Sequence, residues 1–336
     1  MRRFWSVLLL CLGLPALVQA DEISDLIRDV VQQDIVTGFE ALEDATGALA
    51  EAADTSCAGP ELISAYKAAF RSWVRVSHLR FGPSEAENRA FALAFWPDPR
   101  GKTPKALRKL LSDDSATPLD ITAYRDVSIA ARGFYALDYL LFDDTLLAGG
   151  RNDRYCALLR VIAADIHATA GELADGWRAY APGLITPGPE TPYRTQEEVL
   201  QVLYKSARTG LQFTAEMRFG RPLGTLEKPR PRRAEAWRSG LSLTLVGEAV
   251  AGSGGLALDL SRTNPNLEKK LDNALSRFAA SVTTLDDPVF AGVTTPEGRF
   301  RIEVLLTELN GIRRIVDQDL GPALGVSAGF NALDGD

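Results

Sequence analysis

Histidine is scarce in this sequence, and its scarcity limits the metal chemistry open to the chain. The 336 residues include 2 histidines, His78 and His167, which fall in different predicted helices. A zinc site of the His-Glu-x-x-His type needs two histidines one turn apart on the same helix, so that type of site is excluded. Positive charge is also in deficit, because the net charge is −7 at pH 7, and this argues against a nucleic-acid partner.

Long apolar runs are missing after the first twenty residues. No later segment has eighteen uncharged apolar residues in a row, so we expect no transmembrane segment in the mature chain. Residues 1–20 carry two arginines near their start, Arg2 and Arg3, then an apolar stretch, and end in the small residue Ala20. This order is typical of a secretory signal peptide. We therefore predict an exported protein that is cleaved after Ala20.

Cysteine is rare as well. Cys11 lies in the predicted signal peptide, which leaves Cys57 and Cys156 in the mature chain. In an oxidising compartment these two residues could form one bridge that closes a loop of about 100 residues. Two unpaired thiols are the alternative, because sequence separation does not fix the distance between two Cα atoms.

Alternating strand patterns are nearly absent, whereas apolar residues recur at helical spacing along most of the chain. This pattern predicts an all-α protein of two four-helix bundles packed together, divided by a proline-rich stretch, with helices that include residues 153–180, 232–251 and 265–285. The predicted units are a signal peptide (1–20), an N-terminal bundle (21–181), a linker (182–194), a C-terminal bundle (195–322) and a tail (323–336). The similar stretches SWVRVSHLR (72–80) and AWRSGLSLT (236–244) suggest an internal duplication.

The segment RGFYALDYLLF, residues 132–142, places polar groups among apolar ones. We expect it to end a helix that begins near Pro118 and runs unbroken to residue 142. Tyr135 and Asp138 are three residues apart, so their side chains share one face of such a helix. The opposite stripe is purely apolar and suits the core of its own bundle. We therefore expect Tyr135 and Asp138 to face another part of the molecule.

Five separated motifs carry a resemblance to a known family. They are SWVRVSHLRFGP (72–83), FWPD (95–98), GFYALDYLLF (133–142), EAWRSGLSL (235–243) and LGVSAGFNALDGD (324–336). With these motifs, nearly the whole mature sequence resembles the imelysin-like family of exported, all-helical bacterial proteins. The resemblance implies a periplasmic location and an association with iron or haem uptake, and some members are classed as metallopeptidases. It also implies that Phe330 and Leu333 dock the tail near a cleft between the bundles.

The chain departs from the family at its hallmark motif, Gly-x-His-x-x-Glu. Gly133 is retained, whereas Tyr135 replaces the histidine and Asp138 replaces the glutamate. Imidazole and carboxylate at this spacing can hold zinc or ferrous iron, but a phenol with a pKa near 10 cannot do so until it loses its proton. Zinc is therefore not expected, and the cofactor stays unknown.

Three roles for this pair remain open. Tyr135 and Asp138 could make a structural polar contact, because buried polar groups must be satisfied. They could line a pocket that binds a small ligand or a partner without metal. They could also supply hard oxygen ligands to ferric iron, whose charge would lower the pKa of the phenol.

Other residues of the family-like motifs are predicted to surround this pair. They are Trp73, Arg75, His78, Arg80, Trp96 and Arg238. Glu248 is a further candidate, because it lies on the apolar stripe of its predicted helix, eleven residues after Trp237, and would be a buried acid there. An arginine beside a buried carboxylate would keep Asp138 ionised and could bind an anionic ligand through paired hydrogen bonds. Interhelical salt bridges are the alternative role for the arginines, and a hydrogen bond between helices is the alternative for His78.

The predicted function is that of a non-catalytic accessory protein of the imelysin-like type, which binds a ligand in iron or haem uptake. Its expected partners are components of an uptake system or of the outer membrane. A metal-dependent peptidase is the competing class, although hydrolysis requires an activated water and the motif has lost its histidine. A scaffold that acts only through partner proteins is the third possibility.

Overall fold

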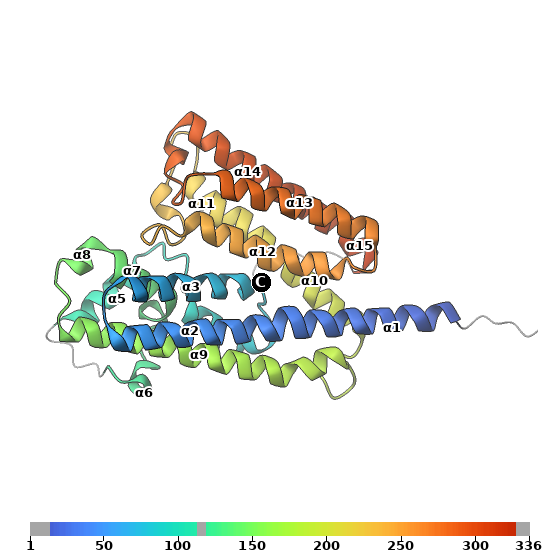
Figure 1. The fold of residues 1–336 in the computed structure, drawn as a ribbon, viewed down its shortest axis with the longest axis horizontal. Coiled ribbons are helices and arrows are strands. Elements are labelled where there is room, and N and C mark those ends of the chain that lie inside the picture. Colours follow the sequence, from blue (N-terminus) through green and yellow to red (C-terminus); the bar gives the residue numbers. More distant parts are fainter. Residues whose placement is uncertain (1–13, 113–118, 327–336) are drawn as a thin grey trace, which may run out of the picture.

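The computed structural model describes residues 14–112 and 119–326, and every regular element in this part of the chain is helical (Figure 1). The expectation of an all-α fold is confirmed. Most of the predicted signal peptide and the predicted docking of the tail by Phe330 and Leu333 lie outside the described residues. Both therefore stay predictions, as do the domain boundaries and the internal duplication.

A long helical rod forms one side of the molecule. Its parts are α1 (Leu14–Asp29), the π-helical turn η1 (Val30–Val36) and α2 (Thr37–Thr55). α2 packs against α3 (Pro60–Val76) and α9 (Asp153–Ile185), which lie alongside it in Figure 1. Buried apolar residues recur every three or four positions along the rod, at Ile27, Val31, Ile35, Phe39 and Leu42. This spacing gives the rod one continuous apolar stripe.

α9 extends further than the prolines predict. We expected it to end near residue 180, but it continues through Pro182 to Ile185. Proline removes one backbone hydrogen bond from a helix, yet Leu184 in the added turn is fully buried and stabilises the extension. The proline-rich connection therefore begins about one turn later than expected.

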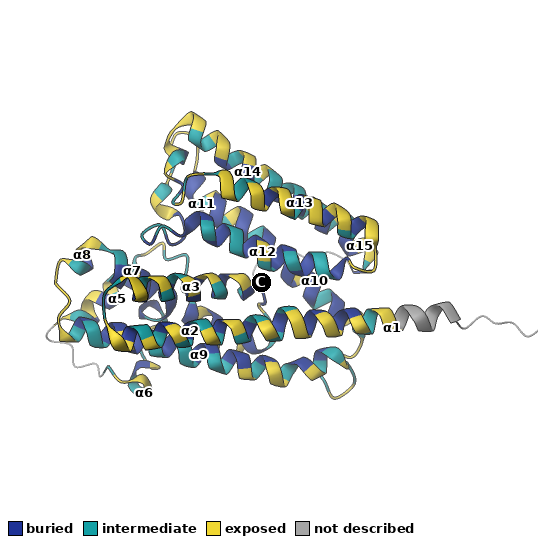
Figure 2. Cartoon of the chain, viewed as in Figure 1, coloured by how far each residue is buried: buried dark blue, intermediate teal, exposed yellow. Residues whose placement is uncertain are grey.

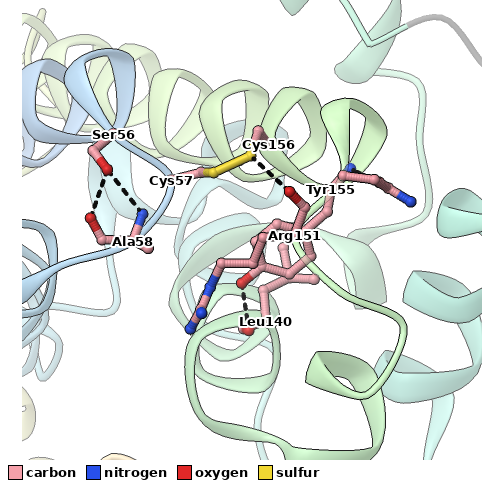
Figure 3. Close-up of a disulfide and its surroundings, with 8 residues drawn as sticks. Ser56, Cys57, Ala58, Leu140, Arg151, Tyr155 and Cys156 are labelled. Carbon is pink, nitrogen blue, oxygen red and sulfur yellow. Dashed lines mark hydrogen bonds between the residues drawn. A yellow bond between two sulfur atoms is a disulfide. The ribbon is translucent and has the colours of Figure 1, made fainter.

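A disulfide fastens the start of α9 to the end of α2 (Figure 3). Cys57 follows α2 and Cys156 lies in the first turn of α9, and their Cα atoms are 5.1 Å apart. Of the two alternatives open from the sequence, the structure has the bridge. It links positions 99 residues apart, so it closes a loop that contains α3 and the short elements after it.

Short helical elements connect α3 to α9. They are η2 (Gly82–Ser84), η3 (Ala86–Asn88), α4 (Arg89–Leu93), α5 (Lys102–Leu111), α6 (Ile121–Tyr124), η4 (Ile129–Ala131), α7 (Gly133–Phe142) and α8 (Asp144–Leu147). Three of them, α6, η4 and α7, lie where one unbroken helix was predicted. The unbroken helix expected up to residue 142 is wrong, because α7 begins only at Gly133. Gly133 has φ +73°, and a Cβ there would lie 2.2 Å from the carbonyl oxygen of Leu93. Only glycine allows the chain to turn so close to α4.

The second half of the chain forms another layer of helices. It contains α10 (Gln196–Phe213), η5 (Thr214–Phe219), α11 (Gly220–Leu223), η6 (Pro231–Arg233), α12 (Ser242–Leu260), α13 (Pro265–Thr284), η7 (Ala291–Thr294), α14 (Pro296–Ile315), η8 (Val316–Leu320) and α15 (Gly321–Ala323). We expected α12 to span 232–251, but it starts ten residues later, after a turn-rich segment. Figure 2 shows exposed residues on the outer faces of α13 and α14 and buried ones between the layers.

α12 joins the two layers by packing against α3 on one side and against α10 and α13 on the other. At Gly252 a Cβ would lie 1.9 Å from the carbonyl oxygen of Arg75, so the two helices cross at backbone contact. By length and composition α12 is the one described helix apolar enough to cross a membrane. Its apolar window is 56% buried inside the protein, as expected for a core helix.

Candidate functional site

A cleft of about 550 Å³ opens between the two helical layers. Its walls come from the end of α3, the segment around α4, α10, η5 and the segment before α12. Five of the predicted site residues line it, namely Trp73, His78, Arg80, Trp96 and Tyr135. The structure therefore brings together residues from three separated motifs of the sequence.

Tyr135 lies in the wall of this cleft and is 7% exposed. Its phenol donates a hydrogen bond to Oε1 of Glu235. Its ring stacks near Trp96, with centroids 6.3 Å apart, and meets Phe70 edge-on at 5.3 Å. Burial first, and then the neighbouring carboxylate of Glu235, raise the pKa of Tyr135 well above its ordinary value of 10.0. The phenol therefore keeps its proton at neutral pH.

Arg218 completes the polar contact behind Tyr135. Its Nε donates to Oε2 of Glu235 at 2.6 Å, and its Nη1 donates to the hydroxyl of Thr214 at 3.3 Å. Arg218 and Glu235 are 5% and 3% exposed. A buried ion pair is tolerated only when hydrogen bonds satisfy both partners, which Tyr135 and Thr214 help to do here.

Sequence reasoning missed both Arg218 and Glu235. Glu235 is the first residue of the motif EAWRSGLSL, so the sequence offered it as a candidate. The sequence did not show that it binds Tyr135 and Arg218. Arg218 lies in η5, a π-helical turn that follows α10. Such turns often occur at functional sites, but nothing in the local sequence announces this one.

Asp138 points to different partners. It is 2% exposed, and the phenol of Tyr66 donates to its Oδ1 at 3.1 Å. Burial raises the pKa of Asp138 to about 6, although Ser239, Arg238 and Tyr66 each act to lower it. Asp138 does not line the cleft. Its contacts fit the structural polar role that the sequence left open.

The pair Tyr135 and Asp138 does not fit a shared metal ion. The phenol is bound to Glu235, whereas the carboxylate is bound to Tyr66, so the two oxygens are directed at separate partners. A ferric site would need a tyrosinate, yet the surroundings raise the pKa of Tyr135. Within residues 14–112 and 119–326, no group of three or more histidine, cysteine, aspartate or glutamate side chains is arranged to hold an ion.

Three predicted residues lie away from the cleft. Glu248 forms ion pairs with Arg71 at 2.7 Å and with Arg75 at 3.3 Å, on the rim where α3 meets α12. Arg238 binds Asp143 at 2.8 Å and lies over the ring of Tyr139, 3.8 Å from its centroid. Arg75 and Arg238 therefore take the salt-bridge role that was the alternative for the arginines, and Glu248 is the acid that Arg75 binds.

His78 lies in the wall of the cleft with an unsatisfied ring nitrogen. Its Nδ1 is buried and has no hydrogen-bond partner, and the hydroxyl of Thr209, also in the wall, is in the same state. Burial lowers the pKa of His78 to about 4, against a hydrogen bond with the backbone of Arg75 that raises it and with a smaller lowering effect from Arg218, so the ring is neutral at pH 7. Two unsatisfied polar atoms in one cleft indicate groups that a ligand or water could complete.

Comparisons with known proteins agree with this fold. A family model described as Imelysin, which carries a peptidase label, matches residues 33–316. The crystal structure of an imelysin-like protein from Psychrobacter arcticum 273-4 superposes with a TM-score of 0.76 at 18% sequence identity, covering 93% of this chain and 98% of that one. No curated protein matches the chain. Because the family model spans most of its length, the chain belongs to the imelysin family.

Proposed function

We propose that this protein is a non-catalytic binding protein whose ligand occupies the cleft beside Tyr135. The cleft carries the proposal, because its volume of about 550 Å³ lies in the range of small-molecule sites. Aromatic side chains form much of its wall, including Phe81, Phe91, Trp96 and Phe213. Lys205 adds positive charge, whereas the charge of Arg80 is paired with Glu85 at 2.6 Å in the same wall. This lining suits an organic ligand with a flat apolar body and an anionic group.

A binding role is favoured over catalysis by the state of Tyr135. The residue at the family's histidine position keeps its proton and is already bound to Glu235. A metallopeptidase needs ligands that hold an ion and leave a position open for water. Here the phenol of Tyr135 is bound to Glu235, and the carboxylate of Asp138 is bound to Tyr66. Both groups therefore have protein partners in place of a metal ion.

We further propose that the protein acts in the periplasm and in iron or haem uptake, together with components of an uptake system. The signal-peptide pattern of residues 1–20 and the family resemblance support this placement. Haem has a flat apolar ring and two carboxylates, and it is therefore a ligand of the class that the cleft suits.

The proposal is tested on protein purified from its own periplasm, by native mass spectrometry and elemental analysis. A bound organic ligand, with or without iron, would support it. The mature protein is then titrated with haem and followed by absorption spectroscopy, beside the variants Lys205→Gln and Lys270→Gln. Lys205 lies in the cleft and Lys270 pairs with Asp319 on the outer surface. Equal haem binding by all three proteins, or none by the mature protein, would contradict a haem site in the cleft.

A metal-dependent peptidase is the second candidate, and the peptidase label of the family is the observation that favours it. The purified protein would then show a peptidase activity that a chelator removes. That activity would disappear in an Asp138→Ala variant while the fold is retained. Activity that survives both treatments would leave this candidate without support.

A further inference from the structure

Positive charge collects around the loop between α11 and η6, although the whole chain has a net charge of −7. Lys228, Arg230, Arg232 and Arg233 are exposed there, and Arg221 lies at the base of the loop. None of these five cations forms an ion pair with a carboxylate in the part of the chain that the structure describes. The five residues therefore form a cationic cluster that no direct ion pair neutralises.

The acid of this loop, Glu227, forms no ion pair with the five cations of the cluster in the described part of the chain. Glu227 is exposed, and its pKa is lowered by hydrogen bonds with its own backbone and Thr225 and, to a smaller extent, by Arg299. Arg232 has a partner of another kind, because its guanidinium lies over the ring of Trp237, 5.6 Å from the centroid. Arg221 and Arg233 are close enough for the charge of Arg233 to act on Arg221, and neither is ion-paired with an acid in the described part of the chain.

Arg221 differs sharply from Arg218, one helical turn before it. The Nε of Arg218 donates to Glu235 at 2.6 Å, as expected for a buried guanidinium. The Nε of Arg221 is also buried, but it has no hydrogen-bond acceptor. Leaving a buried donor on a charged group unsatisfied is costly, so an acceptor from outside the chain would stabilise this arrangement.

The surroundings of Arg221 show where that acceptor would lie. Its guanidinium lies over the ring of Trp96, 5.5 Å from the centroid, so the aromatic plane holds it in place. α11 packs against η6, which carries Arg233. Burial, and then the charge of Arg233, lower the pKa of Arg221, which is the direction that two neighbouring cations produce.

We propose that Arg221 and Arg233 bind an oxyanion of the phosphate class, beside Trp96 and outside the cleft. Two guanidinium groups can each offer paired N–H donors to phosphate oxygens. Free phosphate carries about 1.5 to 2 negative charges at pH 7 and a lipid phosphodiester carries one, so either would offset positive charge at this pair of arginines. The anion is either free in solution or part of a lipid headgroup, and Leu226 at the same loop is 74% exposed to meet a lipid surface.

The first experiment titrates the full mature chain with inorganic phosphate by calorimetry, against chloride at equal ionic strength. We expect phosphate-specific binding that weakens by about tenfold in Arg221→Gln and in Arg233→Gln, since each removes charge-assisted hydrogen bonds. Arg301→Gln is the matched control, because Arg301 is an exposed arginine that pairs with Glu297 on α14. It removes the same charge and should leave binding unchanged.

The second experiment separates the two sources of the anion. Full-length mature chain is sedimented with vesicles of phosphatidylglycerol and phosphatidylcholine, or of phosphatidylcholine alone. Binding to the anionic vesicles that Arg233→Gln abolishes supports a lipid phosphate, whereas binding to inorganic phosphate alone supports a free one. The proposal is overturned if neither probe binds, or if Arg301→Gln weakens binding as much as Arg233→Gln does. Arg233 is exposed, so its variant tests the site even if Arg221→Gln fails to fold.

Discussion

Tyr135 donates a hydrogen bond to Glu235, a residue 100 positions later in the sequence. Tyr135 lies on α7 in the first half of the chain, whereas Glu235 precedes α12 in the second half. Arg218 binds the same carboxylate from η5. One buried carboxylate therefore ties three elements together at the wall of the cleft, and its partners determine how rigid that wall is.

Replacing Tyr135 by phenylalanine should destabilise the protein by about 1–3 kcal/mol. The change removes one hydrogen bond from Glu235, which stays buried and keeps only its contact with Arg218. The measurement is urea unfolding at pH 7, with the free energy of unfolding extrapolated to water.

Tyr204→Phe is the control for this prediction, because it makes the same chemical change elsewhere. The hydroxyl of Tyr204 is buried and has no hydrogen-bond partner, so its removal should be neutral or slightly stabilising. Equal losses of stability in the two variants would mean that the contact with Glu235 contributes nothing specific.

Gly133→Ala should be much more disruptive than Gly150→Ala. Both glycines have positive φ, +73° and +78°, so both variants carry a backbone strain of about 1–2 kcal/mol. Only at position 133 would the new Cβ collide with another backbone, 2.2 Å from the carbonyl oxygen of Leu93, since nothing lies within 4 Å at Gly150. Melting temperature and soluble yield of the two variants measure the difference. Similar values for both would show that the close approach of α7 to α4 is not required.

Periodicity predicts the long helices well, because one buried stripe repeats over many turns. α13 was expected at 265–285 and runs from Pro265 to Thr284. The helix predicted up to residue 142 fails at Gly133, whose positive φ is set by packing against Leu93. A glycine inside an apolar segment looks the same in sequence whether it continues a helix or starts one.

The site was predictable only where a motif marked its residues. Trp73, His78, Arg80, Trp96 and Tyr135 were candidates, and all five line the cleft. The partners of Tyr135 were not predictable, because a contact between residues 100 positions apart depends on how the layers pack. Glu248 shows the reverse case, since its place on an apolar stripe suggested a buried acid and it instead binds Arg71 and Arg75.

Removing the disulfide should lower stability by about 4–5 kcal/mol in the chain-entropy model. Cys57 and Cys156 are separated by 99 residues, so the bridge restricts a large part of the unfolded chain. The double variant Cys57→Ser/Cys156→Ser is compared with the oxidised and the reduced mature protein by urea unfolding. The reduced protein should match the double variant. An unchanged unfolding midpoint after reduction would contradict the expected contribution.

Asp138 should make the protein less stable as the pH rises from about 4 to about 6. Its pKa is about 6 in the folded protein, raised by burial above the ordinary value of 3.8. Between these values the folded state holds a proton that the unfolded state has lost, so protonation favours the folded state at the lower pH. This stabilisation, of roughly 3 kcal/mol, is lost as the pH passes the folded-state pKa.

Two variants isolate this effect from the other carboxylates. Asp138→Asn cannot titrate, so the stability of the wild-type protein minus that of this variant should fall between pH 4 and pH 7. Asp143→Asn is the control, because hydrogen bonds from Thr145 and the charge and hydrogen bond of Arg238 lower the pKa of Asp143 despite its partial burial. The corresponding difference for Asp143 should rise slightly just above pH 4, where the unfolded carboxyl group is still partly protonated, and stay flat from about pH 5 to pH 7, since both states are ionised there. Urea unfolding at four pH values measures both differences. A flat or rising difference for Asp138 would show that its carboxyl group is ionised in the folded protein over the whole range from pH 4 to pH 7.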